Sequence, residues 1–289
     1  MKANCVASTT GPWVRLILTV VTVVAIALPV FADSKSKVSG TFYGEPQAVA
    51  AGTARSYLTM KEGVPVEIGF ELSEEALRSM PPGEKWQPGH EHKMTEYLLP
   101  LPAEAETSIV KVLELDWHPG GHEPPGVYDV PHFDFHFYTI SLAERNAIDP
   151  ADPDYMKKAE QVPSPDLLPA GCVTATPVTP IPRMGVHWVY GDAEELHGKP
   201  FTKTFIHGSW QGRMVFYEPM IAKAFLESKP DVTVQIAAAK CYEPAGYHPT
   251  TYRIRYDDES HTYRVSLGGF AYRGCESRTK TASNSEHDH

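Results

Sequence analysis

The residues best suited to bind a metal lie in one segment, 117–138, which ends in the residues PHFDFHFY. There His132, Asp134 and His136 alternate with three phenylalanines. Side chains of a β-strand point alternately to its two faces, so the polar trio is expected on one face and the phenylalanines on the other. Buried polar groups cost free energy unless something pairs with them, and imidazole and carboxylate groups bind divalent ions. The spacing therefore predicts a divalent-metal site.

Two further histidines extend this prediction. His122 lies on the Pro/Gly-rich loop before the strand and can fold back toward it, and His187 lies in a second block, MGVHW. We expect zinc, iron or manganese as the cofactor, because imidazole and carboxylate ligands suit these ions. The expected ligands are His122, His132, Asp134, His136 and His187.

The catalytic candidates are acidic. Glu218, in the block FYEPM, is expected after a strand and before a helix, where it could act as a general base. Asp134 could be a ligand, a proton carrier, or an acceptor that fixes the tautomer of a neighbouring imidazole. His118 either joins the cluster or is an ordinary loop residue.

Two classes of function stay open at this stage. In the first, the chain is a metal-dependent enzyme whose three protein ligands leave a position on the ion for water or substrate. In the second, it is a non-catalytic binding or structural protein of the cell envelope, and the His/Asp block holds a structural ion or forms an oligomer contact. A closed shell of four ligands would favour the second class.

The elements that must position these residues are expected to be strands. Proline (26) outnumbers glycine (21), and tyrosine (14) is frequent, which favours strands and ordered loops over a helical bundle. We predict a mainly β (α+β) fold, an antiparallel barrel or sandwich with a few short helices. Two β-rich halves, 33–145 and 184–276, are joined by a Pro-rich ordered connection, 146–183, and the tail 277–289 is expected to be disordered.

Several elements can be placed individually. Residues 108–117 are expected to form a strand with Glu114 and Asp116 on one face. A short helix should follow Ser73 as its N-cap, and another should run from Met220 to Ser228. The segments 250–256 and 262–268 read as a hairpin.

The N-terminal segment has the pattern of a secretory signal peptide. Lys2 and Arg15 precede an apolar run from Leu16 to Leu28, and cleavage is expected after Ala32. The run is shorter than the ~20 residues of a spanning helix. We therefore expect a periplasmic or secreted protein with no membrane contact after cleavage.

The cysteines fit an oxidising compartment. After cleavage Cys172, Cys241 and Cys275 remain, and the preferred disulfide joins Cys241 to Cys275, with buried free thiols as the alternative. The formal net charge of -10 argues against a nucleic-acid partner, which would require a basic surface. A small-molecule ligand and a homo-oligomer stay open as partners.

Three blocks carry a resemblance to a known family. They run from Gly121 to Tyr138, from Met184 to Trp188, and over Phe205–Gly208 with Phe216–Ile221. They resemble the signatures of a family of secreted bacterial proteins of unknown function, and the resemblance extends over roughly residues 40–270. It implies an exported, β-rich protein whose defining feature is the His/Asp block. The signature positions are His122, His132, Asp134, His136, His187 and Glu218, whereas His207 occupies a place that would also accept an aromatic residue.

Overall fold

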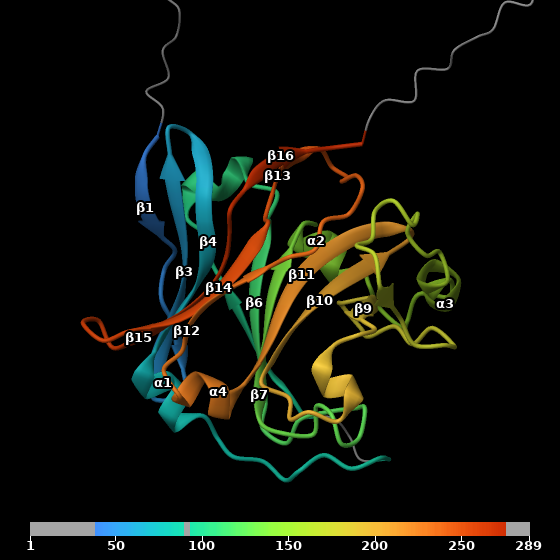
Figure 1. Ribbon diagram of the computed structural model, residues 1–289, viewed down its shortest axis with the longest axis horizontal. Helices are drawn as coiled ribbons and strands as arrows, with labels where there is room; N and C mark the ends of the chain where they lie inside the picture. The colour runs from blue at the N-terminus through green and yellow to red at the C-terminus, as the bar shows by residue number, and fades with distance from the viewer. Residues whose placement is uncertain (1–37, 90–92, 276–289) are drawn as a thin grey trace, which may run out of the picture. The chain divides into compact units, whose positions relative to one another are not determined.

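The computed structural model describes residues 38–89 and 93–275. These residues form two antiparallel sheets of seven strands each, together with a short two-stranded ribbon (Figure 1). The predicted mainly β fold with a few short helices is confirmed. The signal peptide and the tail 277–289 lie outside the described residues, so both stay predictions.

The first sheet takes strands from both ends of the chain, since β4 pairs with β15 in the middle of the sheet. Its strands, in spatial order, are β1 (Gly40–Tyr43), β3 (Gly52–Lys61), β4 (Val64–Ser73), β15 (Thr262–Gly268), β14 (Thr251–Asp257) and β12 (Asp231–Gln235), with β2 (Gln47–Val49) also paired to β3.

The second sheet also combines early and late strands, because β7 pairs with β11. Its order is β5 (Thr95–Leu99), β6 (Val112–His118), β7 (His132–Tyr138), β11 (Arg213–Ala222), β10 (Lys203–Trp210), β9 (Val186–Tyr190) and β8 (Cys172–Val173). The two-stranded ribbon consists of β13 (Gly246–His248) and β16 (Ala271–Arg273).

The helices are all short and lie between strands. They are α1 (Glu74–Ser79), α2 (Leu142–Asn146), α3 (Tyr155–Ala159) and α4 (Lys223–Glu227), with 3₁₀ turns η1 (Ala103–Thr107) and η2 (Glu194–His197). Ser73 caps α1 as predicted, because its side chain accepts a hydrogen bond from the backbone N–H of Ala76. Among the described residues, no helix is long and apolar enough to span a membrane.

The two sheets pack face to face through a shared apolar core. Phe70 of β4 makes edge-to-face contacts with Phe135 and Phe137 of β7, with ring centroids 5.2 and 5.0 Å apart. Within the described chain each sheet ends in edge strands and does not close on itself. The sandwich alternative is therefore confirmed and the barrel alternative is wrong.

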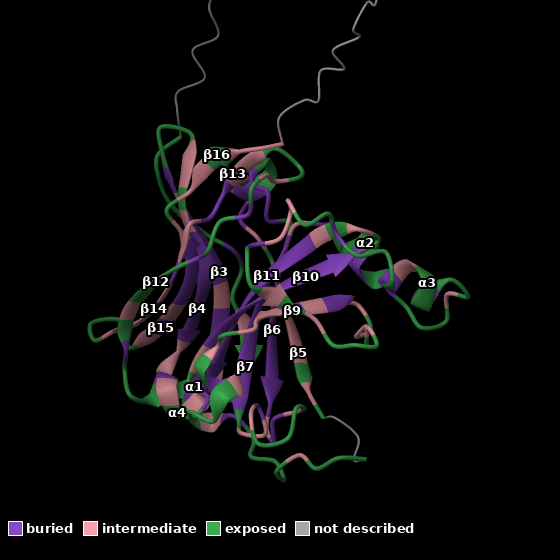
Figure 2. Ribbon diagram, turned by 45° about the vertical axis from the view of Figure 1, so that its right-hand side comes forward, coloured by how far each residue is buried: buried purple, intermediate pink, exposed green. Residues whose placement is uncertain are grey.

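The second sheet is covered on its other face as well. Every residue of β6 and β7 is buried (Figure 2). A second apolar cluster includes Tyr138 and Phe216 of this sheet together with Ile148 and Tyr155 of the segment that follows β7. The predicted Pro-rich connection therefore contributes to the cover of the face that carries the polar side chains, and those side chains lie in the interior.

One expected boundary is wrong. The helix predicted from Met220 begins only at Lys223, and Glu218 lies inside β11 instead of between a strand and a helix. The strand continues because Met220, Ile221 and Ala222 pair with Asp134, Phe133 and His132 of β7. This extension places Glu218 beside the polar residues of β7.

The cysteines match the preferred pairing. Cys241 and Cys275 form a disulfide, and Cys172 is a free, half-buried thiol. The link joins the segment before β13 to the residues after β16.

Candidate metal centres

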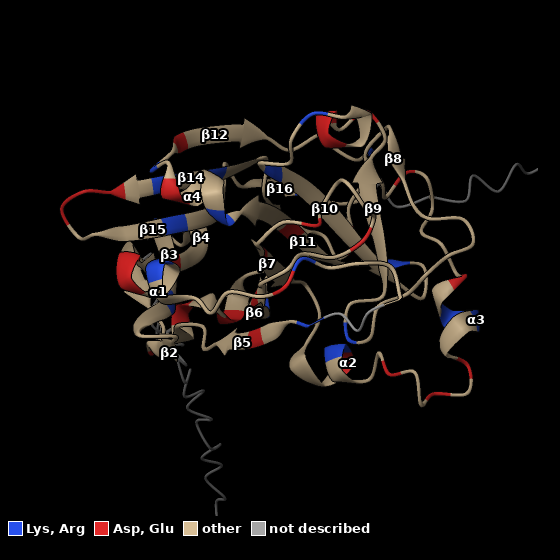
Figure 3. Cartoon of the chain, turned by 90° about the horizontal axis from the view of Figure 1, so that it is seen from below, with Lys and Arg blue, Asp and Glu red and all other residues tan. Residues whose placement is uncertain are grey.

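A row of ionisable side chains crosses three neighbouring strands on one face of the second sheet. Antiparallel register places His118 opposite His132, Asp116 opposite Asp134, and Glu114 opposite His136. We call this row the polar ladder; its members, each no more than 4% exposed, are Glu114, Asp116, His118, His132, Asp134, His136 and Glu218. Such a concentration of buried charge requires partners, and acidic segments on β6 and β11 are visible in Figure 3.

The first group of donors, cluster 1, comprises His118, His122, His132 and Asp134. Its four ligand atoms all lie within 4.8 Å of one another. Oδ2 of Asp134 is 2.8 Å from Nε2 of His118 and 3.9 Å from Nε2 of His122, and Oδ1 of Asp134 is 3.4 Å from Nε2 of His132. One small cation between these atoms could contact all four.

Backbone carbonyls orient two of these rings. The Nδ1–H of His132 donates to the carbonyl oxygen of Val130 at 2.7 Å, and that of His122 donates to the carbonyl of Glu123 at 2.6 Å. Each ring therefore presents its Nε2 lone pair to the cluster, which is the arrangement typical of metal-bound histidines. The loop folds back through Gly121, whose φ of 76° favours glycine and where a Cβ would lie 2.2 Å from the carbonyl oxygen of Tyr128.

The protonation states also suit a metal. Burial lowers the pKa of His132 to about 3, so this ring is neutral. Burial opposes ionisation of Asp134, but the adjacent His118 and His132 outweigh it and hold the pKa of Asp134 well below its usual range. The pKa of His118 is raised, because the effect of the Asp134 carboxylate outweighs that of burial, which alone would lower it. A metal would displace the proton that His118 and Asp134 share.

The second group, cluster 2, comprises His136 on β7, His187 on β9 and Glu218 on β11. Oε2 of Glu218 lies 3.5 Å from Nε2 of His136 and 3.7 Å from Nε2 of His187. Burial and the nearby carboxylates, Asp134 first among them, raise the pKa of Glu218 well above its usual range. A bound cation would reverse that shift.

A third group of acids is neutralised differently. Glu114 contacts Arg145, a fully buried residue on α2. The same guanidinium lies 3.0 Å from Glu96, which also pairs with Arg183 at 2.7 Å. Although Glu114, Asp116 and His136 are close enough to share an ion, the Arg145 cation beside Glu114 makes this the least favourable of the three positions for a metal.

The structure therefore distributes the expected ligands over two places. His122, His132 and Asp134 lie in cluster 1, whereas His136 and His187 lie in cluster 2. Glu218, expected as a catalytic base, lies between the two imidazoles of cluster 2.

Two residues of the site were not assigned from the sequence. His118 is the last residue of β6 and faces His132, a placement that only the register between β6 and β7 reveals. Arg145 is distant in sequence from Glu114 and carries no motif. One sequence pattern points to His118: it follows Glu114 and Asp116 at a spacing of two residues, which places all three side chains on the same face of a strand.

A surface cleft of about 560 Å³ lies at the Arg145 end of the polar ladder. Its polar lining includes Glu96, Arg145, Asn146 and Arg183. No residue that lines it belongs to cluster 1 or cluster 2, as far as the chain is described.

Comparison with known proteins adds a family without an activity. Residues 61–117 are similar to a family described as "TTHB210-like: Hypothetical protein TTHB210". The matched segment ends at Trp117, so it includes Glu114 and Asp116 but precedes the His/Asp block of β7. No curated protein and no solved structure matches the chain. The chain is therefore similar, over part of its length, to an uncharacterised family.

Proposed function

We propose that this chain is an exported metalloprotein that binds one divalent transition-metal ion, with zinc as the best fit, at cluster 1. The observation that carries the proposal is the state of the Nε2 atom of His132 and the Oδ1 atom of Asp134. Both are buried, face each other at 3.4 Å, and have no hydrogen-bond partner among the described residues. A buried polar atom without a partner lowers the free energy of unfolding by about 1–3 kcal/mol, and a shared cation would remove this cost.

The donor set supports zinc over other ions. Three imidazoles and one carboxylate give a tetrahedral shell of nitrogen and oxygen, which suits zinc, while iron or manganese would need additional ligands from solvent. The carbonyls of Val130 and Glu123 hold two of the rings in place before an ion arrives.

A shell of four protein ligands favours a structural or ligand-holding role for this ion over catalysis. His122 is the most exposed of the four, with 18% of its side chain accessible. It comes from the loop between β6 and β7, so we expect the ion to enter from that side and to fix this loop against the sheet.

Elemental analysis of the purified mature protein tests the proposal. We expect His132→Ala to lower the zinc content by one ion per chain. The control is His207→Ala, which removes an equally buried histidine on β10 that belongs to neither cluster, and which should keep the wild-type content. Asp134→Asn repeats the test with a smaller change in volume. Unchanged zinc in both cluster 1 variants would overturn the proposal.

The exported state is supported by the sequence pattern of residues 1–32. We expect a chain produced in a bacterial host to be recovered outside the cytoplasm. Its intact mass should be that of a chain whose first residue is Asp33. A cytoplasmic chain that retains residues 1–32 would overturn this part of the proposal.

A further inference from the structure

We infer that cluster 2 is a second, separate cation site with an open coordination position. The three donors are His136, His187 and Glu218, contributed by three different strands of the second sheet. Since the two clusters share no donor atom, the inference does not depend on the proposed function of cluster 1.

The distances between the donors fit an ion better than they fit hydrogen bonds. Nε2 of His136 and Nε2 of His187 lie 3.5 and 3.7 Å from Oε2 of Glu218. Both exceed the usual N–H···O length of 2.7–3.2 Å. Ligands bound at about 2.1 Å around a tetrahedral ion lie about 3.4 Å from one another, close to the separations observed here.

The ligand atoms of the two buried residues of cluster 2 lack hydrogen-bond partners among the described residues. His136 is fully buried and Glu218 is 1% exposed. Over the described chain, neither Nε2 of His136 nor Oε2 of Glu218 makes a hydrogen bond. The nearest buried guanidinium, that of Arg145, is already engaged by Glu114 and Glu96.

A second acid lies on the other side of the His136 ring. Oδ2 of Asp116 is 3.1 Å from Nδ1 of His136, although the two atoms do not meet the geometry of a hydrogen bond. An ion on Nε2, the atom that faces Glu218, would leave the proton of the ring on Nδ1, beside this carboxylate. The order carboxylate, histidine, ion is the arrangement that orients histidine ligands in many metalloproteins.

Packing fixes both rings of cluster 2. The ring of Phe216 contacts His136 and His187, with centroids 4.8 and 5.3 Å away. Phe216 itself lies over Gly208 of β10, where a Cβ would be 2.0 Å from the phenyl ring. Gly208 thus leaves the space that lets one aromatic ring support both imidazoles.

Two features assign an open position to this site. Cluster 2 supplies three protein donors, which leaves the fourth position of a tetrahedral ion to water or a substrate atom, as in catalytic zinc sites. His187 is 25% exposed, so solvent reaches this end of the site. No residue belongs to both clusters, so they form two separate sites instead of one pair of ions about 3.5–4 Å apart.

The test is a cobalt(II) and zinc titration of the full mature chain and five variants. We expect two ions per wild-type chain, one in His132→Ala, one in His187→Ala, and none in the double variant. Glu218→Gln, which preserves side-chain volume, should also lose one ion. His207→Ala serves as the control and should bind two.

Visible absorption of bound cobalt tests the open position. Adding azide should change the spectrum of His132→Ala, which retains only cluster 2, and leave that of His187→Ala unchanged.

The outcomes separate this inference from the proposed function. A single ion that is lost in His187→Ala and kept in His132→Ala would support cluster 2 and overturn the proposal for cluster 1. A single ion lost in His132→Ala and kept in His187→Ala would overturn this inference alone. A single ion lost in both variants would also overturn it, because the two groups would then form one site. An azide response in His187→Ala alone would overturn the assignment of the open position.

Discussion

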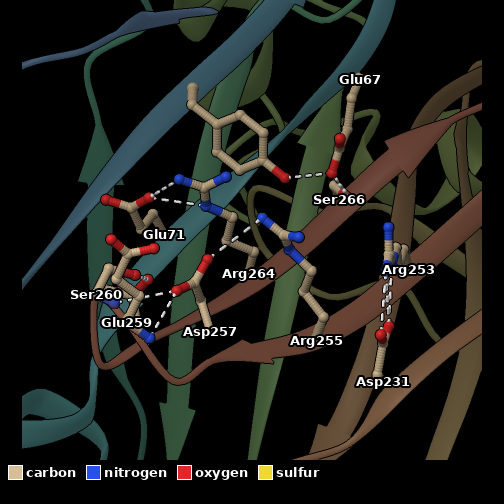
Figure 4. Close-up of polar contacts among 12 residues, drawn as sticks. Glu67, Glu71, Asp231, Arg253, Arg255, Asp257, Glu259, Ser260, Arg264 and Ser266 are labelled. Atoms are coloured by element: carbon tan, nitrogen blue, oxygen red, sulfur yellow. Dashed lines mark hydrogen bonds and ion pairs between the residues drawn. The ribbon is translucent and has the colours of Figure 1, made fainter.

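Two buried carboxylates, Glu71 in the first sheet and Glu218 in the second, have different kinds of partner. In the first sheet, Glu71 is 7% exposed and accepts a hydrogen bond of 2.8 Å from Nε of Arg264 (Figure 4). It accepts another of 2.8 Å from Nε of Arg55. In the second sheet, Glu218 is 1% exposed, and its Oε2 atom faces two imidazoles at distances too long for hydrogen bonds. Arginine side chains thus neutralise the buried Glu71, whereas no arginine contact is observed at Glu218 among the described residues.

A second carboxylate of the first sheet, that of Glu67, also has partners within the chain. Glu67 accepts hydrogen bonds from the hydroxyl groups of Tyr57 and Ser266, at 2.5 and 2.6 Å. These contacts stabilise the fold by themselves. The incomplete contacts of clusters 1 and 2 are better understood as positions whose last partner comes from outside the chain.

Removal of metal should have the largest effect. An ion present at 100 to 1,000 times its dissociation constant stabilises the folded state by about 3–4 kcal/mol. For a domain of this size a chelator should therefore lower the melting temperature by about 10 °C for each ion removed. Differential scanning calorimetry with and without chelator measures the shift, and the His132→Ala, His187→Ala double variant should show none. An equal shift in that double variant would mean that the chelator acts elsewhere.

The second prediction concerns Glu71→Gln. Arg55 and Arg264 donate to different oxygens of Glu71, and in the amide one of these atoms becomes an NH2 donor, so one hydrogen bond and the negative charge are lost. Because Arg55 is 37% exposed, solvent screens part of the cost, and we expect a loss of about 2 kcal/mol. Urea unfolding measures it, and the metal content should stay at the wild-type value. A fall in metal content would show that metal binding by the second sheet depends on Glu71 of the first sheet.

Glu218→Gln should have the opposite sign in chelator-treated protein. A buried carboxyl group whose pKa is raised by burial and by the charge of Asp134 opposes folding at neutral pH. The neutral amide removes that charge, so we expect the metal-free variant to be more stable than the metal-free wild type by about 1 kcal/mol. The comparison requires urea unfolding of both proteins in chelator. A loss as large as that of Glu71→Gln would contradict the contrast between the two sheets.

The smallest effect is expected from Arg253→Ala. Arg253 pairs with Asp231 on the first sheet (Figure 4), and the two side chains are 40% and 64% exposed. Exposed ion pairs contribute little, so the free energy of unfolding should change by less than about 0.5 kcal/mol. The same urea measurement provides a baseline for Glu71→Gln. A change above 1 kcal/mol would show that charge pairs on this sheet matter even where solvent reaches them.

Local patterns predicted much of the fold. The alternation over 132–138 placed three phenylalanines in the core and three polar residues on the opposite face, and the structure confirms both. The hairpin of β14 and β15 and the Ser73 cap were predicted for similar reasons, because each depends on residues close together in the sequence.

The rest depends on contacts between distant segments. The end of β11 could not be predicted, since Met220 and Ile221 stay in a strand only because β7 lies beside them. The pairing of β4 with β15 carries no local signal either. Sequence spacing suggested one metal site, whereas the register of β7 against β6 and β11 separates His132 from His136 and brings His118 into cluster 1.

The strand order has a consequence for how the protein acquires its ions. Neither sheet can be completed until the last third of the chain is present, because β15 and β11 each pair with a strand made much earlier, β4 and β7 respectively. Pairings of such high contact order form slowly. The donors of β7, β9 and β11 meet only at that late stage. We therefore expect the ion of cluster 2 to be drawn from whichever compartment the chain occupies when folding finishes, so that the metal supply there decides which ion this site carries.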